Sequence, residues 1–277
     1  MRSLLELRDL LFSVLPASGN RRPRTTAGCA ASAVQLLGVI VALALPTVPA
    51  AAAVRVVASL GDLGAIAHEV GGADATVTVL AAAGVDPHRV DPRPNLILPL
   101  HSADLLLVNG LGLEDAWLAP LLVAARNGRI QRGGPGYFDT ATVVRLLEVG
   151  GAVDRSQGDV HPGGNPHHTF DPRNGARIAR ALAERLAAID PAHAAGFRSR
   201  AKVLADRLDA FAASWRGRFG QLAAPLRQLV TYHKSLTYLE DWLGLDEVAT
   251  VEPRPGIPPD PGHVAQVLQR LRATGTR

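Results

Sequence analysis

The sequence is poor in sulfur and in aromatic side chains: its 277 residues include one cysteine, one methionine and 4% aromatic residues. The cysteine, Cys29, precedes the most apolar stretch of the N-terminal segment, whereas a lipid-carrying cysteine would have to follow that stretch. A mature chain that begins after this segment has no cysteine, which excludes disulfide bonds and thiolate metal ligands. Any metal site is then expected to use imidazole and carboxylate groups.

A strong excess of charge is also lacking. The formal net charge is +4, and the first 53 residues contribute five arginines and two acids. The remainder therefore holds 29 − 5 = 24 basic and 25 − 2 = 23 acidic residues, a net charge of +1. This balance provides no basic surface for DNA or RNA, so no nucleic-acid partner is expected.

The one long apolar run lies near the N-terminus. Residues 25–54 carry no charge and follow a group of three arginines, a pattern typical of a secretory signal. Pro46, Pro49 and the small residues after them favour cleavage near residues 50–53 over a continuing membrane-spanning helix, which is the alternative. We therefore predict a signal peptide region over residues 1–53 and a periplasmic protein.

Beyond this region, short apolar runs alternate with helical patterns, which predicts an α/β fold with parallel sheets. The expected strands are residues 54–59, 76–81, 104–110, 228–232 and 247–252.

A long stretch without strand patterns, residues 171–219, separates the two groups of strands. Asp-Pro pairs at 171–172 and 190–191 begin two predicted helices, the first reaching Ile189. The second helix carries an apolar stripe at helical spacing, interpreted as core packing. The stripe consists of Phe197, Leu204, Leu208, Phe211, Trp215 and Phe219.

These patterns predict two α/β lobes joined by a stiff helical connector. The expected boundaries are 54–190 for the N-terminal lobe, 191–219 for the linker helix and 220–277 for the C-terminal lobe. Ligands of two-lobed proteins commonly bind in the cleft between the lobes.

Three histidines stand in loops that suit metal binding. His88 follows a predicted strand, at the sheet edge where α/β proteins bind ligands, and His233 directly follows another. His167 lies in a loop rich in proline and glycine. Together they provide three nitrogen ligands for a tetrahedral Zn²⁺ and leave one position open.

The residues from Val54 onward resemble the zinc/manganese solute-binding proteins of bacterial ABC importers over about 220 positions. The matching segments are SLGDLGAIAHEVGG (59–72), DPH (86–88), SADLLLVNGLGLEDAWL (102–118), DVHPGGNPHHTFDP (159–172), YHKSLTYLEDWLGL (232–245) and EPRPGIPPDPGH (252–263).

The resemblance implies two α/β lobes joined by a rigid helix, one metal in the cleft, and no catalysis. It implies that His88, His167 and His233 are the metal ligands, and a histidine at the third position favours Zn²⁺ over Mn²⁺. The implied partner is the membrane permease of an ABC importer, and a monomer is expected. The alternatives are a manganese receptor or metal-dependent adhesin of the same fold, and a secreted zinc hydrolase, although no acid stands beside the three histidines as a general base.

The sequence departs from the family's pattern at its C-terminal end. Family members normally continue past a point like Arg277 with a strand, a helix and an acidic fourth ligand, so the second lobe is expected to be incomplete. The fourth metal position would then be empty, held by water, or filled by a substitute such as Glu252 or Asp260.

The remaining candidates are given structural interpretations. His168 is expected to face away from its neighbour His167, and His161 to be a solvated loop residue, with a low-affinity capture site as the alternative. Three further histidines, His68, His193 and His263, are expected to be structural or surface residues, and His101 is left open as a residue that supports a ligand. Asp86 is expected to orient His88. Glu114 and Asp115 are interpreted as the first turn of a helix.

Overall fold

The computed structural model describes residues 52–150 and 161–276. The predicted signal region lies almost wholly outside these residues. Within the described part of the chain, no helix is long and apolar enough to cross a membrane.

The N-terminal lobe is built on a parallel sheet with the strand order β2-β1-β3-β4. Its strands are β1 (Val54–Ala58), β2 (Ala75–Val79), β3 (Leu105–Val108) and β4 (Tyr137–Asp139). The first three confirm predicted strands, whereas β4 was missed because its three residues are too few to show a periodic pattern. The parallel α/β architecture is confirmed.

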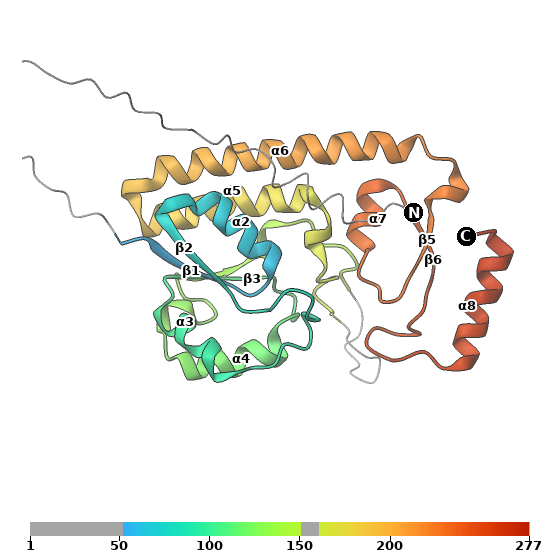
Figure 1. Ribbon diagram of the computed structural model, residues 1–277, viewed down its shortest axis with the longest axis horizontal. Helices are drawn as coiled ribbons and strands as arrows, with labels where there is room; N and C mark the ends of the chain where they lie inside the picture. Colours follow the sequence, from blue (N-terminus) through green and yellow to red (C-terminus); the bar gives the residue numbers. More distant parts are fainter. Residues whose placement is uncertain (1–51, 151–160, 277) are drawn as a thin grey trace, which may run out of the picture. The chain divides into compact units, whose positions relative to one another are not determined.

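Helices cover both faces of this sheet (Figure 1). On one face α2 (Gly61–Gly71) and α5 (Pro172–Ile189) pack against alternate residues of β1, including Val56. On the other face α3 (Ile97–Ser102) and α4 (Asp115–Ala125) pack around the intervening residues. Burial on both faces explains why β3 appears as a continuous apolar run in the sequence.

The long helix α6 (Ala194–Gly220) confirms the predicted connector, and α5 confirms the helix before it. The apolar stripe of α6 serves two cores. Phe197 and Leu204 are buried with the first sheet, whereas Trp215 and Phe219 pack beside Trp242. Core packing is therefore the correct interpretation of most of the stripe, although the side chain of Phe211 is 43% exposed.

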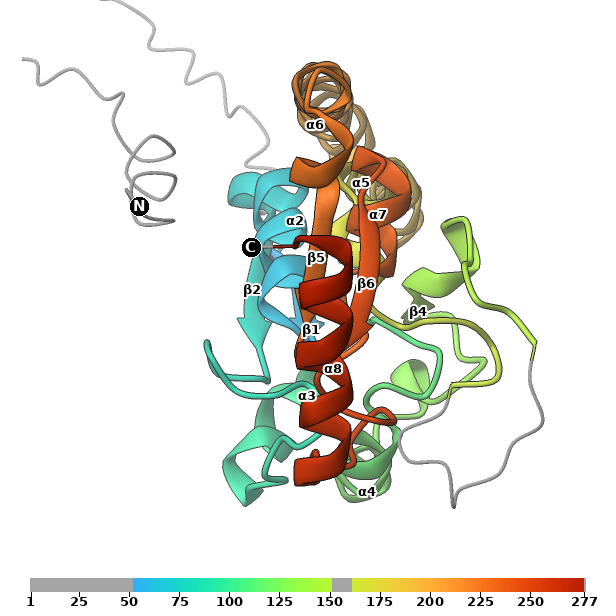
Figure 2. The ribbon, with the colours of Figure 1, turned by 90° about the vertical axis from the view of Figure 1, so that its right-hand side faces the viewer.

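A second parallel sheet pairs β5 (Gln228–Thr231) with β6 (Asp246–Thr250). Between these strands α7 (Thr237–Leu243) packs against α6, and α8 (Pro261–Thr274) packs against β6 (Figure 2). Both strands confirm predicted ones. The lobe boundaries themselves stay a prediction.

Short 3₁₀ helices complete the described structure. They are η1 (Gly72–Asp74), η2 (Pro94–Leu96), η3 (Gly128–Ile130), η4 (Thr140–Val143), η6 (His168–Phe170), η7 (Pro191–His193) and η8 (Ala224–Arg227).

Candidate metal centre

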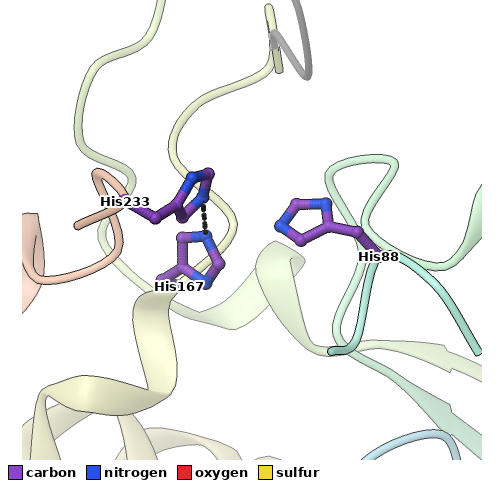
Figure 3. A group of neighbouring side chains, drawn as sticks. All are labelled: His88, His167 and His233. Atoms are coloured by element: carbon purple, nitrogen blue, oxygen red, sulfur yellow. Dashed lines mark hydrogen bonds between the residues drawn. The ribbon is translucent and has the colours of Figure 1, made fainter. Parts of the chain in front are cut away.

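The three predicted histidines come together from loops that are far apart in the sequence. His88 lies in the loop after β2, His167 immediately precedes η6, and His233 follows β5. Each of these side chains offers one nitrogen, and these three nitrogens all lie within 4.8 Å of one another. Figure 3 shows His88 approaching from one side and His167 and His233 from the other.

The closest approach within the group joins two ring nitrogens. Nε2 of His167 lies 3.3 Å from Nε2 of His233 (Figure 3). The ring centroid of His88 is 5.4 Å from that of His167 and 5.6 Å from that of His233. The rings meet nearly edge to face, so their nitrogens converge instead of their faces stacking.

A carboxylate fixes the orientation of His233. Oε2 of Glu252 lies 2.8 Å from Nδ1 of His233 and also accepts a hydrogen bond from the backbone N–H of Gly256. Because a carboxylate accepts, Nδ1 carries the proton and the Nε2 lone pair is directed at the group. Glu252 thus supports a ring, and Asp260, the other substitute ligand considered, accepts from the backbone N–H of His263 and caps α8.

Asn165 holds the loop that carries His167. Its Oδ1 accepts a hydrogen bond from the backbone N–H of His167 at 3.0 Å. Its Nδ2 donates to the hydroxyl of Thr237, and Tyr238 donates its hydroxyl hydrogen to the Asn165 carbonyl. Sequence reasoning missed Asn165, although asparagine two residues before a loop histidine is a recognisable turn signal.

Burial keeps His167 neutral. Desolvation, reinforced by the neighbouring rings of His88, His233 and His161, lowers the pKa of His167 to about 3. An imidazole with this pKa has its lone pair available throughout the neutral pH range. The site is therefore ready to coordinate a cation there without first losing a proton from this ring.

Glu114 connects the ends of β1 and β3 beneath the site. Its carboxylate is buried and accepts hydrogen bonds from the Ser59 hydroxyl and from the backbone N–H groups of Asn109 and Gly110. Asn109 in turn donates from Nδ2 to the Pro166 carbonyl, one residue before His167. The predicted place at the start of a helix is confirmed, because Glu114 is the N-cap of α4, but its contacts across the sheet were not foreseen.

Asp86 and His168 are close in sequence to the ligand candidates His88 and His167. Asp86 accepts a hydrogen bond from the backbone N–H of His88, so it orders the loop that carries this histidine. His168 is fully buried and its Nε2 lies 3.0 Å from the Asn109 carbonyl oxygen, which confirms that it turns away from His167.

The interpretation of His161 as a solvated loop residue is wrong. Its ring is partly buried, its Nδ1 lies 2.8 Å from the Leu111 carbonyl oxygen, and its centroid is 5.3 Å from that of His88. The prediction failed because the glycines and prolines around His161 indicate a loop but do not indicate the direction in which that loop folds.

The remaining histidines agree with structural or surface interpretations. His68 is exposed on α2, whereas His193 pairs with Asp190 through a 2.6 Å contact. His263 and His101 contact the carbonyl oxygens of Thr250 and Ala125, respectively.

Most of the chain matches a known protein family. The model of the family described as "ZnuA: Zinc-uptake complex component A periplasmic" matches residues 56–277. The chain belongs to this family. It is therefore a metal-binding, substrate-binding protein of the ABC-importer type and not an enzyme, which sets the zinc hydrolase alternative aside.

Individual relatives carry the names of different metals. The "Manganese ABC transporter substrate-binding lipoprotein PsaA" of Streptococcus pneumoniae serotype 4 is 23% identical over 223 residues, 79% of this chain and 69% of the relative. The "Iron-binding protein YfeA" of Yersinia pestis is 27% identical over 218 residues, covering 78% and 66% of the two chains. Members of the family are thus exported receptors for divalent metals.

A solved structure shares the fold. The crystal structure of ZnuA superimposes with a TM-score of 0.66 at 22% identity and covers 80% of each chain. The predicted fold class, two α/β parts with a long helix, is confirmed at this level.

Proposed function

We propose that this protein captures Zn²⁺ with His88, His167 and His233 and delivers it to the membrane permease of an ABC importer. The convergence of three imidazole nitrogens within 4.8 Å is the observation that carries the proposal. Imidazole nitrogen suits zinc, whereas manganese favours carboxylate and water oxygens.

The separation of the nitrogens supports a tetrahedral ion. Two nitrogens bound to one tetrahedral Zn²⁺ at about 2.0–2.1 Å lie about 3.3–3.4 Å apart. The two Nε2 atoms of His167 and His233 are 3.3 Å apart, so they match one edge of such a tetrahedron. Glu252 behind His233 has the role that carboxylates commonly have behind zinc-bound histidines.

A pocket lies beside His167. His167 lines this pocket together with Pro87, Asn109 and Phe170. The cargo enters and leaves as a solvated cation, so the ligands must release it when the receptor docks on its permease. We place this capture in the periplasm, after export directed by the N-terminal segment, and assign it to a monomer.

A manganese receptor is the second candidate, because the relative from Streptococcus pneumoniae is named for manganese. The two candidates differ in the expected order of affinities. The nitrogen donor set predicts tighter binding of Zn²⁺ than of Mn²⁺, and an oxygen-rich site would show a smaller difference.

Isothermal titration of the metal-free protein tests the proposal. Zinc should bind with a dissociation constant well below about 1 μM, corresponding to more than about 8 kcal/mol. Binding should be lost in the triple variant His88→Ala, His167→Ala, His233→Ala and retained in His68→Ala, which removes an exposed histidine of α2. Unchanged binding in the triple variant would remove the proposed site.

A further inference from the structure

Two of the ligand candidates, His167 and His233, belong to different parts of the fold. His167 lies in the loop that leads through η6 into α5, which packs on the first sheet, whereas His233 follows β5 of the second sheet. Their Nε2 atoms are nevertheless only 3.3 Å apart (Figure 3). Because a binding site needs its groups held to within about 0.5 Å of the productive geometry, the relative position of these two segments is critical.

One side-chain amide joins the backbones of both segments. Oδ1 of Asn165 accepts a hydrogen bond from the backbone N–H of His167 at 3.0 Å. Nδ2 of the same amide donates to the carbonyl oxygen of Lys234, also at 3.0 Å. Lys234 directly follows His233, so Asn165 connects the backbone of one ligand candidate with the backbone beside the other.

The partners of this amide fix its orientation. The backbone N–H of His167 can only donate and the Lys234 carbonyl can only accept, so exchanging the amide oxygen and nitrogen would break both hydrogen bonds. Asn165 is 7% exposed, and hydrogen bonds are stronger where water is excluded. Asn165 therefore holds the two segments in one relative position.

Further contacts tie Asn165 to the helix that follows His233. Nδ2 also lies 3.2 Å from the Thr237 hydroxyl and 3.1 Å from Oε2 of Glu148. The hydroxyl of the buried Tyr238 donates to the Asn165 carbonyl oxygen at 3.0 Å. Since Thr237 and Tyr238 begin α7, both the side chain and the backbone of Asn165 contact the segment that carries His233.

Ion pairs join the same parts of the fold in a different way. Asp241 of α7 pairs with Arg145 and Arg173 at 3.1 and 3.2 Å, and all three side chains are partly exposed. Ion pairs exposed to solvent contribute little to stability and are screened by salt. They connect side chain to side chain, whereas Asn165 bonds the backbone of the ligand segments.

We infer that Asn165 is a positioning residue that sets the distance between His167 and His233 and thereby the affinity for the ion, an inference that rests on the proposed zinc site. Its oxygen and nitrogen are both bonded to backbone groups, so it acts through the two histidines and does not bind the ion itself. Without this amide, the segment that carries His233 can shift relative to His167. The two nitrogens then no longer match one edge of a tetrahedron.

The variants Asn165→Ala and Asn165→Asp test this role in zinc titrations against a competing chelator. Alanine removes both hydrogen bonds, so zinc affinity should fall by about 10–100-fold, the usual loss for a group that orients metal ligands. Aspartate keeps the acceptor for His167 but cannot donate to Lys234, and it should lose most of the same affinity. The aspartate variant carries the test if the alanine variant does not fold.

Asn127 offers matched control variants, because its side chain makes the same kinds of hydrogen bond between α4 and η3. Its Oδ1 accepts from the backbone N–H of Arg129, two residues later, and its Nδ2 donates to the carbonyl oxygens of Leu100 and Ala103. Asn127→Ala and Asn127→Asp should lower stability but leave zinc affinity unchanged. An equal loss of zinc affinity in the Asn127 and Asn165 variants would assign the effect to general destabilisation and overturn the inference.

Cobalt(II) is a second probe, because its visible absorption depends on the arrangement of its ligands. The cobalt-loaded Asn165→Asp variant should differ in this spectrum from the wild-type protein, whereas Asn127→Asp should match it. Unchanged zinc affinity or an unchanged cobalt spectrum in Asn165→Asp would overturn this inference alone. Absence of zinc binding in the wild-type protein would instead overturn the proposed function.

Discussion

The Glu252 carboxylate contacts the ring of a ligand candidate, with Oε2 lying 2.8 Å from Nδ1 of His233. We expect Glu252→Gln to weaken zinc binding by about 10–100-fold, because a neutral amide holds the imidazole N–H less firmly and lowers the basicity of the ring. Titration against a competing chelator measures the change. Glu184→Gln, which alters an exposed carboxylate paired with Arg198, is the control. Equal affinities for the two variants would mean that Glu252 does not support the site.

The contacts of Glu114 lead to a prediction about the stability of the fold. Its buried carboxylate accepts from one hydroxyl and two backbone N–H groups, and burial raises its pKa. Replacement by glutamine turns half of the acceptor into a donor, which should lower the free energy of unfolding by about 1–3 kcal/mol. Denaturation in urea checks this value.

The neighbouring variant Asp115→Asn provides the comparison for Glu114. Asp115 is exposed and pairs with Arg132 at the surface, so its replacement should change stability by about 0.5 kcal/mol or less. If the two variants lost the same amount, the hydrogen bonds of Glu114 would have no special importance for the fold.

Residue types alone pointed to part of the candidate site. His88, His167 and His233 were identifiable because each follows a strand or lies in a loop of the kind that binds ligands. Asn165, Glu252 and His161 were not assigned their observed contacts, because these depend on how loops separated by tens of residues fold back on one another. Such contacts have no periodic pattern along the chain.

The backbone is tightly constrained at the junction of β3 and α4. Gly110 has a φ of +87°, and a Cβ placed there would overlap the carboxylate of Asp139. We expect Gly110→Ala to lower the free energy of unfolding by about 1–3 kcal/mol, and to weaken zinc binding by displacing the neighbouring Asn109. Thermal and chemical unfolding, together with zinc titration, measure both effects.

Gly61→Ala is the matched control at the start of α2, where an added Cβ meets nothing within 4 Å. Alanine there should leave stability unchanged or slightly raise it. A Gly110→Ala variant as stable as Gly61→Ala would contradict the described turn.

Elements with a clear period were predictable, and short ones were not. The helices α5 and α6 followed from their Asp-Pro starts and apolar spacing, and β1 and β3 from their apolar runs. The strand β4 escaped because its three residues carry one buried aromatic, Phe138, which by itself indicates no secondary structure.

For the molecule as a whole, the buried histidines predict how stability depends on pH. The pKa of His167 is lowered to about 3 from an ordinary value of 6.5. Between these values the unfolded chain binds a proton at this residue and the folded chain does not, so acid favours unfolding. The free energy of unfolding of the metal-free protein should therefore decrease as the pH falls below about 6.5.

The variant His167→Gln isolates this contribution. Its stability should fall less steeply than that of the wild-type protein between pH 6.5 and pH 4 in denaturant titrations of the metal-free state. The other titrating groups are common to both proteins and cancel in the difference. If the free energies of unfolding of the variant and the wild-type protein changed in parallel with pH, His167 would not be held neutral by the fold.

The architecture could be predicted from the whole chain, but the metal preference could not. Alternating strands and helices and the separated sequence motifs indicated the α/β lobes and the family. Relatives named for manganese and for iron both align with more than three quarters of this chain, so membership of the family does not fix the metal.

Anomalous diffraction at the zinc edge, recorded from crystals of the zinc-loaded protein, tests the central claim most directly. We predict one strong peak within about 2.0–2.1 Å of a ring nitrogen of each of His88, His167 and His233. A strong peak bonded to other residues, with these three histidines making no contact to it, would contradict the account.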